Sequence, residues 1–214
     1  MNILSFPTGP YATNMYIICC KDIPDAVIVD PGAKSFEMVL KTVQEHSLKP
    51  IAIWLTHSHW DHIVDAAKIK KEFSLPIYMH EEDRGNLEKP GSDGVPMAVP
   101  VFEGTTPDHL IKDGDLLTVG NFSFKVIHTP GHTPGGVCFY CQKEKTLFSG
   151  DTFYRGLIGS LSLPTSQAER MWQSLAKIAT LPPDTIVFPG HGPSTIIKDE
   201  PWLSNAKKMG VVHS

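Results

Sequence analysis

One short segment, residues 56–62, constrains what this chain can fold into more than any other part of the sequence. Its letters, THSHWDH, place three imidazoles and one carboxylate within six positions, directly after an apolar strand predicted at 51–56. Imidazole and carboxylate are ligands that Zn²⁺, Fe²⁺ and Mn²⁺ share. Side chains two apart on an extended loop point the same way, so His57 and His59 can hold one ion. Asp61 and His62 follow at the turn into a predicted helix and can reach a second ion.

Three further segments repeat the pattern of a strand followed by a turn that carries one residue of a ligand type. They are residues 126–132, 147–151 and 187–192. Gly or Pro flanks that residue each time, which permits a sharp turn and a close approach of the backbone. A single histidine in such a turn is more often a surface or hydrogen-bonded side chain than a ligand, so the prediction depends on the whole set. Seven ligand-type residues at strand ends predict a metal centre at one edge of a β-sandwich: His57, His59, Asp61, His62, His132, Asp151 and His191.

Short apolar runs bounded by turn signals predict strands in two blocks, each of which ends in helices. This order favours an α/β domain with two β-rich halves. The predicted strands are 14–19, 26–30, 51–56, 77–79, 116–119, 122–127, 137–140, 146–149 and 185–188. The predicted helices are 36–45 with Ser35 as its N-cap, 61–73, 166–179 opening on a Ser166/Glu169 capping box, and 201–209. Residues 88–107, rich in Gly and Pro, are expected to form a long ordered loop of functional importance.

Composition narrows the class of protein. The 214 residues predict one domain spanning 1–214, and 41% hydrophobic residues exclude wholesale disorder. A net charge of −4 disfavours binding to nucleic acid or to an anionic membrane. We expect a cytoplasmic protein, because the sequence shows no membrane-spanning run, no signal peptide and only four cysteines. Cys138 lies in the predicted strand 137–140 and Cys141 directly follows it, and at this spacing the two are expected on opposite faces of the strand.

The pattern His-x-His-x-Asp-His, followed at a distance by His, Asp and His, resembles the metallo-β-lactamase superfamily, and within it the glyoxalase II-like hydrolases. The resemblance extends from Val29-Asp30-Pro31-Gly32 to Pro189-Gly190-His191-Gly192-Pro193. It implies a four-layer αββα sandwich with a dinuclear site at one edge. It also implies the division of ligands: His57, His59 and His132 for one metal, Asp61, His62 and His191 for the other, and Asp151 as the bridge.

Segments 153–159 and 190–195 resemble most the short bacterial glyoxalase II-like group, which lacks a C-terminal glutathione-binding domain. The true β-lactamases resemble the motif less well, because one subclass lacks the bridging Asp and others place Cys there. Two departures concern the substrate rather than the metals. Ser160 and Ser162 stand where the family usually has Arg and Asp, and Val64-Asp65 replaces a common Gly-Gly.

The resemblance implies a dinuclear hydrolase, with two divalent ions that are Zn²⁺ by preference and Fe or Mn as alternatives. A metal-bridged hydroxide would cleave a small thioester of the hydroxyacylglutathione type, such as S-lactoylglutathione, while Asp61 handles the proton. The alternatives are a persulfide dioxygenase with one iron, a lactone or phosphodiester hydrolase, and a non-catalytic protein. Asp30 is expected to pin a turn beneath the His loop, whereas Tyr154 and Arg155 follow Asp151 closely enough to reach a substrate. His80 is expected to have no ligand-like neighbours.

Overall fold

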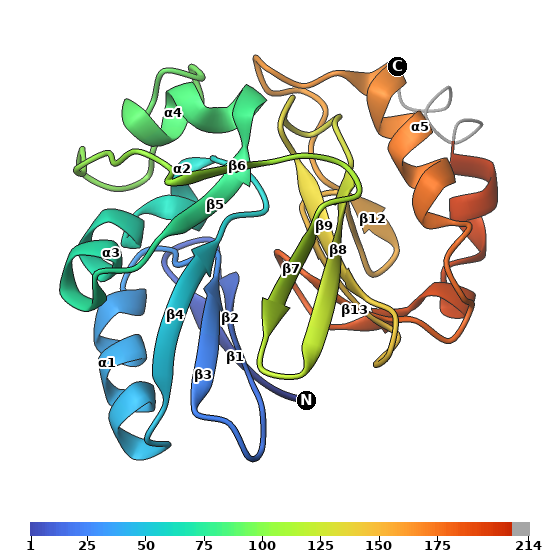
Figure 1. The fold of residues 1–214 in the computed structure, drawn as a ribbon. Helices are drawn as coiled ribbons and strands as arrows, with labels where there is room; N and C mark the ends of the chain where they lie inside the picture. Colours follow the sequence, from blue (N-terminus) through green and yellow to red (C-terminus); the bar gives the residue numbers. More distant parts are fainter. Residues whose placement is uncertain (207–214) are drawn as a thin grey trace.

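The computed structural model describes residues 1–206 of the chain. Two six-stranded β-sheets pack face to face, and helices cover the outer side of each sheet (Figure 1). Within residues 1–206, no helix has the length and apolar character needed to cross a membrane.

The first sheet comes from the N-terminal half and has the order β1-β2-β3-β4-β5-β6. Its first three strands pair antiparallel, and β3 to β6 pair parallel. Parallel neighbours require crossover connections, which place α1, α2 and α3 between these strands in the chain. The strands are β1 (Asn2–Thr8), β2 (Thr13–Cys19), β3 (Asp25–Val29), β4 (Lys49–Trp54), β5 (Ile77–His80) and β6 (His109–Ile111).

The second sheet has the order β14-β13-β10-β9-β8-β7 and is antiparallel except for β10 and β13. A separate hairpin, β11 (Phe153–Tyr154) with β12 (Leu157–Ile158), follows β10. The strands of the sheet are β7 (Leu116–Val119), β8 (Phe122–His128), β9 (Val137–Cys141), β10 (Thr146–Gly150), β13 (Ile186–Pro189) and β14 (Thr195–Ile196).

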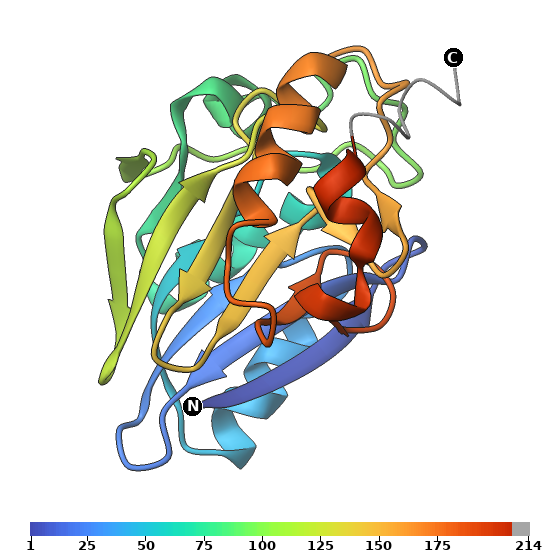
Figure 2. The ribbon, with the colours of Figure 1, turned by 90° about the vertical axis from the view of Figure 1, so that its right-hand side faces the viewer.

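Helices α1 and α3 lie outside the first sheet, and α5 lies outside the second, as Figure 2 also shows for α5. The α-helices are α1 (Ser35–Glu45), α2 (Trp60–Ile63), α3 (Ala66–Phe73), α4 (Arg84–Glu88) and α5 (Ala168–Ile178). The 3₁₀ helices are η1 (Glu81–Asp83), η2 (Ile197–Asp199) and η3 (Pro201–Asn205).

Three apolar cores correspond to the three interfaces between four layers. The core between the sheets includes Trp54, Phe124 and Phe139, and Trp54 packs on both rings at centroid distances of 5.2 and 5.3 Å. A second core joins the first sheet to α1 and α3, and a third joins the second sheet to α5. The predicted αββα sandwich is therefore confirmed. Cys138 lies in the α5 core and Cys141 in the inter-sheet core, so they occupy opposite faces of β9 as predicted.

Each predicted strand overlaps an observed strand, and 116–119 coincides with β7. The predicted loop is also present, because residues 89–108 contain no helix or strand. The predicted helix 61–73 is divided into α2 and α3 by a turn at Val64-Asp65. The predicted helix 201–209 begins as the 3₁₀ helix η3, and its residues 207–209 lie outside the described part of the chain.

Both predicted N-caps are wrong, because tertiary contacts take their place. The N-cap of α1 is Lys34, and the cap hydrogen bond comes from Asp65 Oδ2, which accepts from the Phe36 backbone N–H at 3.0 Å. The N-cap of α5 is Gln167, while the Ser166 hydroxyl donates to the His132 carbonyl at 3.0 Å.

Candidate metal centre

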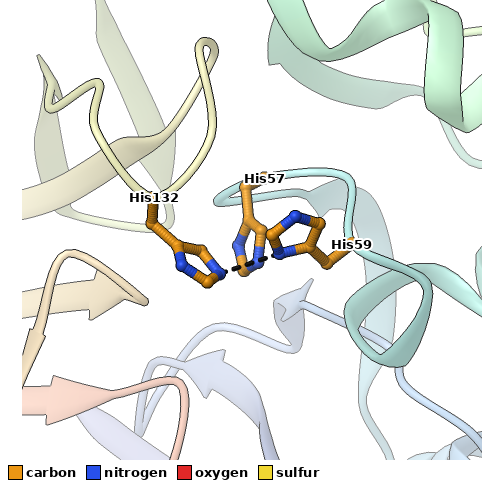
Figure 3. A group of neighbouring side chains, drawn as sticks. All are labelled: His57, His59 and His132. Carbon is orange, nitrogen blue, oxygen red and sulfur yellow. Dashed lines mark hydrogen bonds between the residues drawn. The ribbon is translucent and has the colours of Figure 1, made fainter. Parts of the chain in front are cut away.

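Three histidines from both sheets form the first cluster. His57 and His59 follow β4, and His132 follows β8 (Figure 3). One ring nitrogen of each lies within 4.8 Å of the others, and His59 Nδ1 lies 2.8 Å from His132 Nε2. The outer nitrogens of two rings have partners: His57 Nδ1 lies 3.1 Å from the Thr56 hydroxyl, and His132 Nδ1 lies 2.9 Å from the Ser160 carbonyl. Their Nε2 atoms are thus the ones that face the cluster.

The environment of the first cluster keeps the imidazoles of His57 and His59 in the neutral form that binds metals. Burial lowers the pKa of His59 to about 3, with a further contribution from His132. Burial and then the neighbouring His62 hold the pKa of His57 well below 6.5. Neutral imidazole has a free lone pair on one nitrogen, which is the form a divalent cation requires.

The second cluster contains Asp61, His62 and His191, whose ligand atoms also lie within 4.8 Å of one another. Asp61 Oδ2 lies 3.5 Å from His62 Nε2 and 3.3 Å from His191 Nε2, and the two Nε2 atoms are 3.4 Å apart. The first two residues belong to α2, whereas His191 follows β13. At 24% side-chain exposure, His191 is the member of this cluster that opens toward solvent.

Asp151 lies between the two clusters. Its Oδ2 is 3.3 Å from His132 Nε2 in the first cluster and 3.5 Å from His191 Nε2 in the second. Its Oδ1 is 3.4 Å from His62 Nε2. All seven residues singled out in the sequence are thus brought together at one edge of the sandwich.

The electrostatics of the second cluster are dominated by the carboxylates of Asp61 and Asp151. Burial would lower the pKa of His62, but the carboxylates of Asp61 and Asp151 act more strongly together and raise it well above 6.5. Likewise, burial would raise the pKa of Asp61, yet His62 and a hydrogen bond from His191 lower it to about 2. The two buried carboxylates thus favour positive charge beside them, which a protonated His62 or a divalent ion held by the same ligands can supply.

A second observation also indicates that this set of ligands suits divalent ions. His57 Nε2 and Asp151 Oδ1 are buried polar atoms that have no hydrogen-bond partner within the described residues. Buried polar atoms normally have partners, and an ion is one reason for an exception. Two clusters of nitrogen and oxygen ligands, one of them with a carboxylate, match the preferences of Zn²⁺, Fe²⁺ and Mn²⁺.

The backbone beneath the clusters is fixed by Asp30, as expected from the sequence. Asp30 Oδ1 accepts from the Thr56 backbone N–H at 2.7 Å, and Oδ2 accepts from the Thr56 hydroxyl at 2.6 Å. The same Oδ2 lies 3.0 Å from His62 Nδ1. Glycine is needed at position 190, because a Cβ there would collide with Asp151 Oδ1.

Sequence reasoning missed the residues that hold the ligand loops. The Thr13 hydroxyl donates to Asp61 Oδ2 at 2.7 Å, and Asn14 Nδ2 donates to the Pro189 and Gly192 carbonyls on either side of His191. These polar residues open a β-strand and match no short motif, so only their proximity in the fold reveals them.

Asp83 was missed as well, although it joins the two loops of the first cluster. It accepts hydrogen bonds from the Ser58 backbone N–H at 3.0 Å, the Thr133 hydroxyl at 2.9 Å and the Gly135 backbone N–H at 2.6 Å. In the sequence it ends an acidic run, which is typical of a solvated surface.

The rim beside His191 is aromatic. The Tyr11 carbonyl lies 3.0 Å from His191 Nδ1, and the Tyr11 ring packs on Trp60 at 5.0 Å. The Tyr154 ring lies 5.8 Å from the His191 ring, whereas Arg155 is exposed. Burial, and then the nearby Asp151 charge, hold the pKa of Tyr154 well above 10, so its hydroxyl stays protonated. Of the two residues expected within reach of a substrate, Tyr154 is the one that faces the clusters.

Two expectations about other residues change. His80 does have ligand-like neighbours, since it groups with Glu82 and His128. However, the His80 and His128 rings stack 3.9 Å apart at 16°, and parallel imidazoles direct their lone pairs side by side rather than toward one ion. Ser160 and Ser162 hydrogen-bond to each other through their hydroxyls at 2.9 Å, in place of the family's charged pair.

An αββα sandwich with two clusters of His and Asp at one edge of its sheets has the architecture of a metallo-hydrolase superfamily. A family model described as the metallo-beta-lactamase superfamily matches residues 8–191, and the chain belongs to this superfamily.

Individual relatives extend this finding. The chain is 31% identical over 203 residues to hydroxyacylglutathione hydrolase GloC of Haemophilus influenzae, covering 94% of this chain and 95% of the relative. The crystal structure of BLEG-1 B3 metallo-beta-lactamase has a TM-score of 0.87 and 39% identity, covering 95% of this chain and 100% of the other. The structure of TTHA1623 in a di-iron-bound form has a TM-score of 0.78 and 33% identity, covering 92% and 96%.

Proposed function

We propose that this protein is a dinuclear metal-dependent hydrolase that cleaves a small thioester of the hydroxyacylglutathione type. The observation that supports it most is the position of Asp151, whose oxygens lie within 3.5 Å of histidines from both clusters. A carboxylate in this position can contact two adjacent cations and offset part of the charge of each. The proposed ions are two Zn²⁺, with Fe and Mn as alternatives, and the di-iron form of TTHA1623 is a precedent for iron.

Two divalent ions at these ligands would supply a hydroxide nucleophile near neutral pH and polarise the substrate carbonyl. Thr13 fixes Asp61 by its hydrogen bond, so that this carboxylate can orient the nucleophilic water and take its proton. In the reaction, the water oxygen bonds to the carbonyl carbon, the carbon–sulfur bond breaks, and the thiolate takes up a proton. The products are a carboxylate and a thiol. Tyr154, a neutral donor beside His191 whose hydroxyl hydrogen-bonds Asp151, would turn to hydrogen-bond the substrate oxygen.

The thioester is favoured by similarity to hydroxyacylglutathione hydrolase GloC along 94% of this chain. A β-lactam is a second candidate substrate, favoured by the 39% identity to BLEG-1, a B3 metallo-beta-lactamase. Lactones, phosphodiesters and oxidation of a persulfide at a single iron are the further alternatives that the sequence leaves open.

One panel of assays separates these functions. Purified protein of known metal content is incubated with S-lactoylglutathione, a chromogenic cephalosporin, an acyl-homoserine lactone, a phosphodiester and glutathione persulfide, the last with an oxygen electrode. The proposal expects the highest kcat/KM for S-lactoylglutathione, with two metals per chain and no oxygen uptake. Faster turnover of another substrate would replace the proposed thioester hydrolysis by hydrolysis of that substrate. Oxygen uptake with one iron would replace it by persulfide oxidation.

A further inference from the structure

Four of the five histidines in the two clusters have a fixed partner for the ring nitrogen that points away from the cluster. Such a partner sets which nitrogen carries the proton and holds the plane of the ring. The partners are side-chain or carbonyl oxygens at 2.9 to 3.1 Å: Thr56 for His57, Asp30 for His62, Ser160 for His132 and Tyr11 for His191.

His59 is the exception. Its Nδ1 faces the cluster, 2.8 Å from His132 Nε2, so its Nε2 is the outer nitrogen. That Nε2 is buried and has no hydrogen-bond partner within residues 1–206. A carboxylate oxygen, Asp93 Oδ2, lies 3.9 Å away, and the two side chains are only 4% and 8% exposed.

Asp93 is held in this position by its own hydrogen bonds. Its Oδ2 accepts from Asn86 Nδ2 at 2.9 Å, and its Oδ1 accepts from the Val95 backbone N–H at 3.0 Å. Asn86 Nδ2 also donates to the carbonyl of Ser58, the residue before His59. The same amide thus holds both the loop that carries Asp93 and the loop that carries His59.

The Asp93 side of this contact borders a cavity, although His59 itself does not line it. A cavity of about 210 Å³ is lined by Ser58, Asn86 and Asp93 among others. Shortening 3.9 Å to an ordinary N–H···O distance of about 2.9 Å takes a shift of roughly 1 Å.

We propose that Asp93 is the positioning residue for His59: its carboxylate accepts the Nε2–H and thereby turns Nδ1 toward the ion of the first cluster. Carboxylate–histidine–metal arrangements raise the basicity of the ligating nitrogen and fix its direction, and removing the outer partner typically costs 10- to 100-fold in metal affinity. The loop after α4 carries none of the seven cluster residues, and this proposal gives it a role in metal binding. The inference depends on metal binding by the proposed site, but not on the identity of the substrate.

A purely structural role for Asp93 would be to anchor its own loop. Ser92 provides the matched control, because its hydroxyl donates to the Gly85 carbonyl at 3.2 Å and contacts Asn86 Oδ1 at 3.5 Å. Ser92→Ala therefore removes an anchor from the same loop without changing the neighbours of His59.

The experiment measures Zn²⁺ release to a chromophoric chelator from wild type, Asp93→Ala, Asp93→Asn and Ser92→Ala, each loaded with Zn²⁺. NMR of ¹⁵N-histidine-labelled, Zn²⁺-loaded protein follows the His59 Nε2 proton, and thermal unfolding checks that each variant folds. We expect Asp93→Ala to weaken one of the two ions 10- to 100-fold and to expose the His59 proton to rapid exchange. Asp93→Asn keeps a neutral acceptor and should fall between Asp93→Ala and wild type, while Ser92→Ala should stay within about threefold of wild type.

Equal effects of Asp93→Ala and Ser92→Ala would overturn the inference, and so would a rapidly exchanging His59 proton in wild type. If Asp93→Ala fails to fold, Asp93→Asn decides by the same two readouts. Wild-type protein that binds no Zn²⁺ would overturn the proposed function and this inference together. Wild-type protein that binds two ions, with Asp93→Ala unchanged, would overturn only the inference.

Discussion

The Asp83 carboxylate accepts a hydrogen bond from the Thr133 hydroxyl at 2.9 Å, across 50 residues of sequence. Asp83 follows β5 of the first sheet, and Thr133 follows β8 of the second. Since the same carboxylate also binds the Ser58 backbone, it joins the His57–His59 loop to the His132 loop. The first cluster therefore depends on a buried acid that is not one of its members.

Replacing this acid should weaken the first cluster and the fold together. Asp83→Ala leaves three buried donors without their acceptor, and each unsatisfied group costs about 1–3 kcal/mol. We expect a lower melting temperature and a 10- to 100-fold loss of affinity for one ion. Calorimetry and chelator competition measure the two effects. Glu82→Ala, which removes an exposed neighbour paired with Arg170, is the control and should change neither; an equal response of both variants would contradict the role given to Asp83.

The occupancy of each site should respond differently to three substitutions. His132→Ala should empty mainly the first cluster and His191→Ala mainly the second, because each removes a ligand from one side. Asp151→Ala should lower occupancy at both, since its oxygens face histidines of both clusters. Elemental analysis after gel filtration measures the ions per chain. Two ions retained by Asp151→Ala would show that this carboxylate is not shared.

The seven cluster residues could be predicted because each sits in a short motif at the end of a strand. His57, His59, Asp61 and His62 lie within six consecutive positions, so the local pattern alone predicts a metal site. The supporting residues could not be found in this way. Thr13 lies 48 positions from Asp61, and the two meet only because β2 pairs with β3 and β3 pairs with β4, the strand that leads to Asp61.

The failed helix caps show the same limit for local structure. Ser35 and Ser166 satisfy the local rule for an N-cap. In the folded protein, however, side chains and helix ends can also form hydrogen bonds with groups that are distant in the sequence. Asp65 reaches the first turn of α1 from the turn between α2 and α3. The Ser166 hydroxyl donates its hydrogen bond to the His132 carbonyl instead of capping α5. Tertiary contacts thus outweigh the local preference of about 1 kcal/mol.

Tyr154 should contribute to turnover through its hydroxyl. Tyr154→Phe keeps the ring beside His191 but removes the neutral donor. A hydrogen bond to developing charge is worth about 1.5–3 kcal/mol, so kcat should fall roughly 10- to 150-fold with both ions retained. Steady-state kinetics with S-lactoylglutathione measure this. Tyr11→Phe alters an exposed tyrosine on the same rim and should leave kcat unchanged; similar losses in both variants would point to a general change of the rim.

Asp61 is the residue for which ligand binding and proton handling can be separated. Asp61→Asn keeps the shape of the side chain and one ligand oxygen but removes the basic carboxylate. We expect kcat to fall by about 10²- to 10⁴-fold, the usual contribution of a positioned acid–base group, while the ion of the first cluster is retained.

Thr13→Val is the companion variant. It removes the 2.7 Å hydrogen bond that orients Asp61 but leaves the carboxylate, so kcat should fall by only about tenfold. Metal analysis and thioester hydrolysis are measured on both. Near-normal turnover of Asp61→Asn with two ions bound would show that another group takes the proton, and the mechanism proposed for this site would then be wrong in its central step.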